Sequence, residues 1–257
     1  MLKGIDISSH NGYPLTGLAL SEYNKSDFVI VKATQGNYYV NPYCDNAIQG
    51  CISDGKLWGF YHYAGGCDPI VEAEYFVKNC KNYFKHGVPV IDWEREQNQH
   101  FGNTSWVKQF VDKVYELTGV WCLVYVSLAD LHQVANCAPT CGLWLAQWGV
   151  SSPGPVSPWQ TWTIWQWTSN NGVLDQNYAQ LDKESWLKIA NGGTVANSGN
   201  TSNNNSSTSN SATNGITTSA AVQKMAEDVI AGMYGNGETR KQKLYDTIQK
   251  RVNELCK

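Results

Sequence analysis

The first 190 residues alternate between short apolar runs and stretches with helical periodicity, and this alternation restricts the fold more than any other feature. Runs that suit strands lie at 3–7, 28–33, 57–63, 88–93, 121–126, 143–148 and 161–167, and helical patterns lie between them at 15–23, 42–54, 69–84, 104–117 and 128–134. Strands that alternate with helices indicate an α/β domain with a parallel sheet. Seven or eight strands favour a closed, modified (β/α) TIM-like barrel, in which chemistry sits where the strands end.

The composition changes sharply at residue 191. Residues 191–219 contain no charged and no aromatic side chain and consist mainly of Asn, Ser, Thr and Gly. Such a segment buries too little apolar surface to offset its ordering entropy, so we expect a flexible linker. The sequence therefore predicts a barrel over 1–190, a linker over 191–219 and a small all-α module over 220–257.

Charge and hydropathy exclude several classes of partner. Residues 1–190 carry 12 basic and 17 acidic side chains, and residues 220–257 carry seven basic and five acidic ones. With no basic excess to neutralise phosphates, we expect no nucleic-acid partner. No run of 18 apolar residues predicts a membrane span, and the opening MLKGIDISS lacks a signal-peptide pattern.

Carboxylates follow the predicted strands. Asp6 closes the first strand, Asp92 and Glu94 close the fourth, and Asp175 follows the last. A lone acid at such a position usually caps a helix or pairs with a base, but three acids after two buried strands favour a site. Residues two apart in a strand share a face, so we expect Asp92 and Glu94 to lie together and to raise one another's pKa. A neutral acid beside an ionised one is the pair that glycoside hydrolysis needs.

Aromatic residues supply a second signal. Four tryptophans, at 159, 162, 165 and 167, lie within nine residues, and Tyr61, Tyr63, Tyr125, Trp144 and Trp148 fall on or near strand ends. Flat aromatic faces stack on sugar rings and suit a wet groove. Most tryptophans in strands are packing residues, so we expect more than half of these to belong to the core.

The eight cysteines are predicted to be mostly buried small apolar side chains. His132, Cys137 and Cys141 form the one arrangement with ligand types close together, and it lacks a second Cys pair. We therefore expect no metal and no cofactor.

Six motifs occur in an order and spacing that resemble glycoside hydrolase family 25, the lysozymes of phages and fungi that cut bacterial peptidoglycan. They are GIDISSHNG at 4–12, GFYHYA at 59–64, IDWE at 91–94, LWLAQW at 143–148, WQW at 165–167 and VLDQN at 173–177. The resemblance implies a modified β/α barrel that cleaves the β-1,4 bond between N-acetylmuramic acid and N-acetylglucosamine with retention.

The same resemblance implies roles for individual residues. Glu94 corresponds to the general acid/base, and Asp92 to a partner that stabilises or orients, through direct attack or through the substrate's N-acetyl group. Asp6 and Asp175 correspond to two flanking acids. The expected sugar-binding wall consists of Tyr61, Tyr125, Trp144 and Gln166.

Residues 222–255 are similar to the short helical repeat that closes some phage lysozymes and binds the bacterial wall. The segment has an apolar stripe, which favours self-association, and a turn at Gly235, Asn236 and Gly237. Backbone amides at this turn could hold a muropeptide carboxylate beside Arg240. The expected partner is peptidoglycan, reached from the host cytoplasm when the infected cell lyses.

Alternative functions predict different sequence features. A non-catalytic peptidoglycan- or chitin-binding barrel would lack the acid, yet Glu94 and three aspartates are present. A chitinase would favour a D-x-x-D-x-D-x-E run, which is absent. A cysteine-based amidase or peptidase cannot be dismissed by counting residues, but no nucleophile motif occurs.

Overall fold

The computed structural model describes residues 1–194. Its strands and helices follow one another in the order β1 (Leu2–Ile7), η1 (Ser9–Asn11), α1 (Gly17–Lys25), β2 (Phe28–Gln35), β3 (Tyr39–Val40), α2 (Cys44–Ser53), β4 (Leu57–Tyr63), α3 (Pro69–Cys80), β5 (Val88–Asp92), α4 (Trp106–Thr118), β6 (Leu123–Ser127), η2 (Leu128–Cys137), β7 (Leu143–Ala146), β8 (Ile164–Thr168), β9 (Asp175–Ala179) and α5 (Lys183–Ala190).

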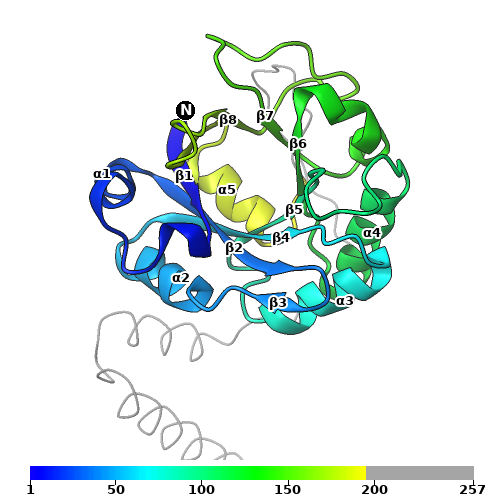
Figure 1. Ribbon diagram of the computed structural model, residues 1–257, viewed down its shortest axis with the longest axis horizontal. Coiled ribbons are helices and arrows are strands. Elements are labelled where there is room, and N and C mark those ends of the chain that lie inside the picture. Colours follow the sequence, from blue (N-terminus) through cyan, green and yellow to red (C-terminus); the bar gives the residue numbers. More distant parts are fainter. Residues whose placement is uncertain (195–257) are drawn as a thin grey trace, which may run out of the picture. The chain divides into compact units, whose positions relative to one another are not determined.

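The strands close into a barrel of eight (Figure 1). The order around the ring is β1-β9-β8-β7-β6-β5-β4-β2, and a β1–β2 pairing joins its ends, while the short β3 pairs with the end of β2 outside the ring. Seven of the eight strands are parallel. The eighth, β9, runs antiparallel to both of its neighbours.

The predicted α/β barrel is confirmed, and an all-parallel sheet is wrong. The pattern did not indicate β9, because its sequence DQNYA turns polar Asp175 and Asn177 toward the interior and lacks the apolar run of a strand. α5 was also not predicted, and residues 128–134, expected to be α-helical, belong to the 3₁₀ helix η2.

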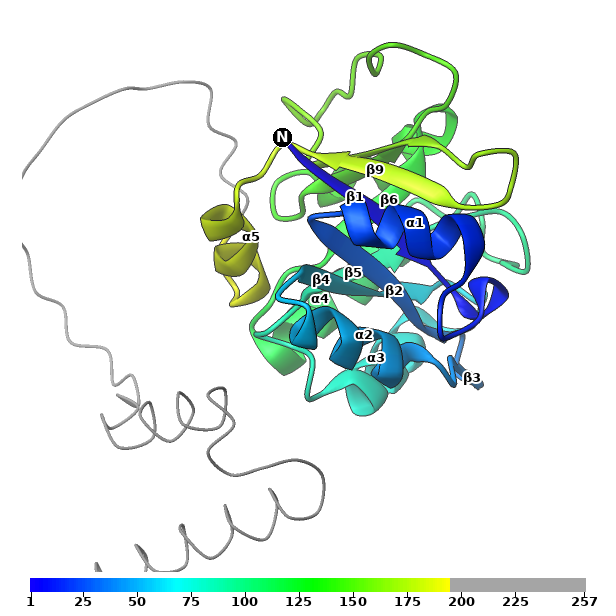
Figure 2. The ribbon, with the colours of Figure 1, turned by 90° about the vertical axis from the view of Figure 1, so that its left-hand side faces the viewer.

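Alternation along the strands divides the core into two clusters. Inward-facing side chains such as Phe28, Ile30, Val88 and Val90 fill the barrel, and the next inward positions toward the strand ends are polar. The helix α5 covers the end of the barrel at which β1 begins (Figures 1 and 2). Its Trp186 ring packs 4.7 Å from that of Phe28, so one end of the barrel is apolar and closed.

Outward-facing side chains pack against the helices and form the larger cluster. It contains six buried cysteines, at 44, 51, 80, 122, 137 and 141, while Cys67 is half-buried, so burial of most cysteines is confirmed within residues 1–194. In the same range, no three His, Cys, Asp or Glu side chains gather as metal ligands do. No helix of residues 1–194 is long and apolar enough to cross a bilayer.

Candidate active site

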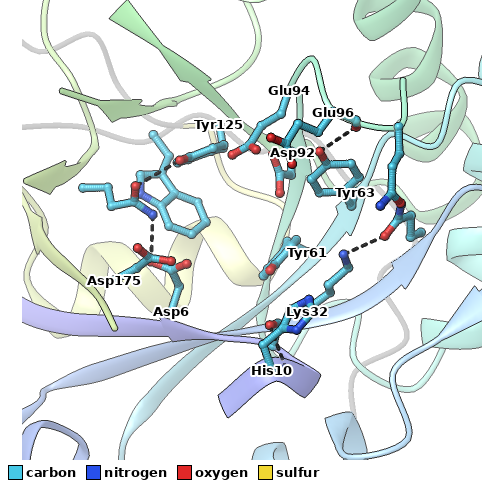
Figure 3. A pocket seen from close by; sticks show the side chains of 15 residues that line it. Asp6, His10, Lys32, Tyr61, Tyr63, Asp92, Glu94, Glu96, Tyr125 and Asp175 are labelled. Atoms are coloured by element: carbon cyan, nitrogen blue, oxygen red, sulfur yellow. Dashed lines mark hydrogen bonds between the residues drawn. The ribbon is translucent and has the colours of Figure 1, made fainter. Parts of the chain in front are cut away.

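A cavity of about 260 Å³ opens at the end of the barrel opposite α5, where the parallel strands finish (Figure 3). Fifteen residues line it: Asp6, Ser8, His10, Lys32, Gln35, Tyr61, Tyr63, Asp92, Glu94, Glu96, Gln97, Tyr125, Trp144, Gln166 and Asp175. All eight residues predicted as catalytic or sugar-binding within the barrel are among them.

Strand geometry explains why four carboxyl groups meet here. Asp6 and Asp92 occupy the inward positions that follow Gly4 in β1 and Val90 in β5, and Glu94 comes two residues after Asp92. The intervening Trp93 points the other way and stacks on Trp106, as the alternation predicts.

Asp175 reaches the same rim for a different reason. Since β9 is antiparallel, its first residue lies where the other strands end, and Asp175 pairs directly with Asp6 in the β1–β9 register. Figure 3 shows these two aspartates together on one side of the cavity, with Asp92 and Glu94 on another.

A network of amide and indole groups fixes Asp6. Its Oδ2 accepts hydrogen bonds from Asn177 Nδ2 at 2.7 Å and Gln166 Nε2 at 3.1 Å. Trp144 Nε1 in turn donates to Asn177 Oδ1 at 2.8 Å, and Tyr125 Oη donates to Gln166 Oε1 at 3.0 Å. The network holds Asp6 in one orientation, and Asn177 is a member that sequence reasoning did not single out.

Burial raises the pKa of all four carboxyl groups above the usual range. For Asp6 the next cause is the charge of Asp175, and for Asp92 it is the charge of Glu94. For Glu94 the contact with the Tyr125 hydroxyl lowers the pKa again in part, and Asp175 adds to the rise. The pKa of Asp175 is raised by burial alone. The sequence predicts that Asp92 and Glu94 raise one another's pKa. The charge of Glu94 does raise the pKa of Asp92, but loss of solvent is the largest cause for both groups.

Asp92 has an oxygen with no protein partner. Its side chain is 7% exposed, and its Oδ1 is the one buried side-chain oxygen or nitrogen of residues 1–194 that lacks a hydrogen bond. A buried, unpaired carboxyl oxygen is costly, and such atoms call for an explanation such as a missing ligand group. The carboxyl group of Asp92 lines the cavity, although Oδ1 itself is buried.

Lys32 lies among these acids and was not predicted as a site residue. It occupies the inward position after Phe28 and Ile30 of β2, and its Nζ donates to Gln35 Oε1 at 2.7 Å and lies 4.4 Å from the centroid of the Tyr63 ring. Burial lowers the pKa of Lys32, and the charges of Asp92 and Glu94 act in the opposite direction. A lysine inside the buried run FVIVKATQ was the sequence signal for it.

The four residues expected to form the sugar-binding wall divide into two kinds. Tyr61 and Tyr125 lie at 9% and 7% exposure, and burial raises the pKa of both phenols, so both stay neutral. Trp144 and Gln166 are each 2% exposed, and their polar atoms bind other side chains. The main role of these two side chains is to hold Asn177 and Asp6 in place through hydrogen bonds.

The four tryptophans of segment 159–167 do not line the cavity. Trp159 is buried in the outer cluster, and Trp165 and Trp167 point away from the barrel interior, where both rings pack against Tyr178. The exposed aromatic residue beside the site is Trp148, which is 53% exposed and donates from Nε1 to Gln166 Oε1 at 3.1 Å.

A second cavity extends the first past Glu94 and Tyr125. It measures about 590 Å³ and runs between Trp148, Ser127 and Asp130. Together the two cavities form a cleft with Glu94 on their shared wall, large enough for sugars on either side of this carboxyl group. A buried carboxyl group whose pKa is raised can donate a proton to a glycosidic oxygen. The predicted wall-binding residues Gly235, Asn236, Gly237 and Arg240 lie outside the described residues.

Comparison with known proteins gives two family matches. Residues 5–176 match the model described as glycosyl hydrolases family 25, and residues 223–256 match the CW_7 repeat. The lysozyme of Streptococcus phage Cp-7 is 27% identical over 98% of this chain and 69% of its own length. The lysozyme of Streptococcus phage Cp-9 is 28% identical, with 74% of this chain and 57% of its own length covered. The N,O-diacetylmuramidase of Chalaropsis sp is 27% identical, with 64% and 87% covered.

Solved structures show the same fold. A muramidase from Acremonium alcalophilum superposes with a TM-score of 0.64 at 24% identity, over 75% of this chain and all of its own. A lysozyme from Streptomyces coelicolor gives a TM-score of 0.63 at 23% identity, over 74% of this chain and 97% of its own.

Proposed function

The chain belongs to the glycosyl hydrolases family 25, and we propose that it is an endolysin-type muramidase. It is a glycoside hydrolase of the lysozyme type that acts on peptidoglycan. The proposed reaction cleaves the β-1,4 bond between N-acetylmuramic acid and N-acetylglucosamine with retention at the anomeric carbon. The observation that carries this proposal is the meeting of Glu94 with Asp6, Asp92 and Asp175 on one cleft.

Glu94 is the proposed general acid/base. Burial raises its pKa, so the protonated form persists toward neutral pH and can give its proton to the leaving glycosidic oxygen. The resulting carboxylate then takes a proton from the water that attacks the anomeric carbon. Lys32 stabilises this carboxylate between the two steps.

Asp92 is proposed to act through the substrate's acetamido group. Its carboxyl group lines the cavity and is proposed to accept the acetamido N–H, which would direct the acetamido oxygen onto the anomeric carbon as the glycosidic bond breaks. Water then opens the cyclic intermediate from the opposite face, so the configuration is retained. Direct attack by an aspartate is the alternative, and it would leave a glycosyl–enzyme ester. Asp6 and Asp175 are proposed to stabilise positive charge that develops on the sugar ring.

The test of the activity is mass spectrometry of digested peptidoglycan. New reducing-end muramic acid is the expected product, whereas new reducing-end glucosamine would mean a glucosaminidase, and cleaved stem peptides would remove the glycosidase assignment. Glu94→Gln should abolish product formation. Glu116→Gln, which removes a carboxylate from the exposed face of α4, serves as the matched control.

The alternative function is a barrel that binds peptidoglycan or chitin without cutting it. It predicts that wild type and Glu94→Gln bind glycan equally and that neither releases fragments. The proton donor and its three companion acids favour the enzyme.

The proposed domain arrangement joins the barrel (1–190) to a wall-binding module (220–257) through the linker (191–219). The match of residues 223–256 to the CW_7 repeat supports the module, and Gly235, Asn236, Gly237 and Arg240 are its proposed ligand-binding residues. Self-association through its apolar stripe would raise avidity for the wall. The likeness to phage lysozymes supports a route from host cytoplasm to bacterial cell wall.

A further inference from the structure

A second groove lies beside the catalytic cleft, on the other side of the loop that follows β5. It measures about 620 Å³ and is lined by Tyr38, Gly65, Gly66, Cys67, Arg95, Gln97, Asn98 and Gln99, and we call it the Arg95 groove. Gln97 also lines the catalytic cavity, and Arg95 also lines the arm that runs toward Trp148. The groove therefore borders both cavities of the catalytic cleft and shares a lining residue with each.

Close backbone packing builds the groove. A Cβ at Gly65 would lie 2.5 Å from the Gly36 Cα, and a Cβ at Gly66 would lie 2.5 Å from the Gln99 backbone nitrogen. Only glycine permits these approaches, so the loops after β2, β4 and β5 meet without side chains between them. Their contact leaves a shallow, open groove lined by backbone and by amide side chains.

Side-chain hydrogen bonds fix both walls. The fully buried Glu72 accepts from the backbone nitrogens of Gly65 and Cys67, and His62 Nε2 lies 2.8 Å from its Oε2. On the opposite wall Gln97 adopts a φ of 56°, a strained value for a residue with a side chain, and its Oε1 accepts from Gln35 Nε2 at 2.7 Å. The groove is thus preformed and linked to the catalytic cavity through Gln35.

The charge of the groove is opposite to that of the cleft. Arg95 is the sole arginine of residues 1–194, and it is exposed. Although Glu94 and Glu96 flank it in sequence, no carboxylate of the described residues lies within 4 Å of its guanidinium. The guanidinium lies instead 4.9 Å from the centroid of the Phe101 ring, which stacks on the buried Trp93. Arg95 therefore packs on an aromatic ring and makes no ion pair with any of the described residues.

An acidic cleft would repel an acidic substrate. Asp6, Asp92, Glu94, Glu96 and Asp175 line the catalytic cavity, and Asp130 lines its extension. Peptidoglycan carries short peptides on its muramic acid residues, and these stem peptides end in and contain free carboxylates. A planar guanidinium binds a carboxylate through two parallel hydrogen bonds, and amide side chains pair with peptide groups.

We propose that the Arg95 groove binds the acidic stem peptide of the muramyl residue held in the cleft, with Arg95 on a peptide carboxylate. This inference rests on the proposed function, because it requires a muramyl sugar beside Glu94. A phosphate-rich anionic polymer of the cell wall is a second ligand whose negative charge is complementary to Arg95. The amide-lined walls and the connection to the sugar site through Gln97 favour the peptide.

The test compares three soluble substrates with the full chain: glycan strands that carry stem peptides, the same strands stripped of peptides by an amidase, and peptide-bearing strands whose carboxylates have been converted to amides. Wild type should cleave the peptide-bearing strands with a kcat/KM about fivefold above the other two, as expected for one charge-assisted contact at an exposed site. Arg95→Gln should remove this preference, so that its kcat/KM is the same on all three substrates, while Arg95→Lys should keep part of the preference.

Lys78→Gln, an exposed cation on α3, is the matched control and should keep the full preference. Tyr38 lines the opposite wall of the groove, so Tyr38→Ala should also weaken the preference for peptide-bearing strands. Equal loss of Arg95→Gln activity on stripped and peptide-bearing strands would overturn the proposal, because Arg95 would then act on the glycan or on Glu94. A wild type without preference overturns it as well, and so does a preference that appears only when phosphate-rich polymer is present. If wild type cleaves no strand at all, the proposed function fails instead.

Discussion

Replacing Asp92 by Asn should stabilise the barrel while abolishing catalysis. Asn has nearly the same shape as Asp but carries no charge, so the substitution removes a buried carboxylate and keeps the packing around it. Asp92 is 7% exposed, and its Oδ1 has no hydrogen-bond partner. In the proposed mechanism the Asp92 carboxyl group must be free to bind substrate, and the folded protein carries the cost.

The size of the effect follows from the buried charge, because Asn keeps a polar atom at the same place. Burying a charged group without a hydrogen-bond partner costs about 1–3 kcal/mol or more, and the nearby charge of Lys32 offsets part of the cost. We expect Asp92→Asn to raise the free energy of unfolding at pH 7 by about 1–3 kcal/mol. For a domain of this size, that corresponds to a rise in Tm of about 2–10 °C.

The pH dependence has a definite sign. Burial raises the pKa of Asp92 above its unfolded value, so the proton binds more tightly in the folded state. The folded wild type is therefore favoured below the unfolded pKa and loses stability as pH rises through the folded pKa. The advantage of Asp92→Asn should be present at pH 7 and vanish near pH 3, where the wild-type carboxyl group is protonated.

Thermal unfolding followed by tryptophan fluorescence measures this directly. All eleven tryptophans lie in residues 1–190, so the signal reports the barrel and not the C-terminal segment. Glu116→Gln, which removes an exposed charge, should change Tm little at either pH. A lower Tm for Asp92→Asn at pH 7, or an equal rise at pH 3 and pH 7, would refute the reasoning.

Three further outcomes are expected. Lys32→Met should raise the pKa of Glu94, because it removes a cation that lowers it; the alkaline limb of the kcat/KM profile should move to higher pH, and an unmoved limb would contradict this role. Trp144→Phe leaves Asn177 Oδ1 without its donor, so kcat should fall about tenfold with the fold retained, as measured by turnover and near-UV circular dichroism. Removing 220–257 should reduce co-sedimentation with intact walls and preserve turnover of soluble glycan; unchanged sedimentation would exclude the segment as the anchor.

Local sequence patterns predicted most of the fold. Seven strands of the barrel and four α-helices are found close to their expected positions, because each depends on a periodicity of apolar residues within a few neighbours. The same logic placed Asp6, Asp92 and Glu94 at strand ends that face inward. It failed for β9, whose inward residues are polar and whose pairing depends on strands far away in the sequence.

Spacing along the chain could not show which tryptophans meet a ligand. Trp165 and Trp167 carry a pattern suited to a sugar groove, yet β8 turns both to the outside of the barrel. Trp144 lines the cavity as expected, and its Nε1 also donates a hydrogen bond to Asn177. A strand pattern tells which residues share a face, but the closure of the sheet decides which face is the interior.

The sequence by itself determined an α/β barrel followed by a composition break, and it identified the acids that a glycosidase needs, since these depend on local periodicity and residue type. Tertiary structure alone decided that Asp175 stands beside Asp6, that burial outweighs charge in raising the pKa of Glu94, and that Lys32 and Arg95 border the cleft. The physical reason is that burial and electrostatic potential are sums over groups from many strands, and those groups become neighbours only when the barrel closes.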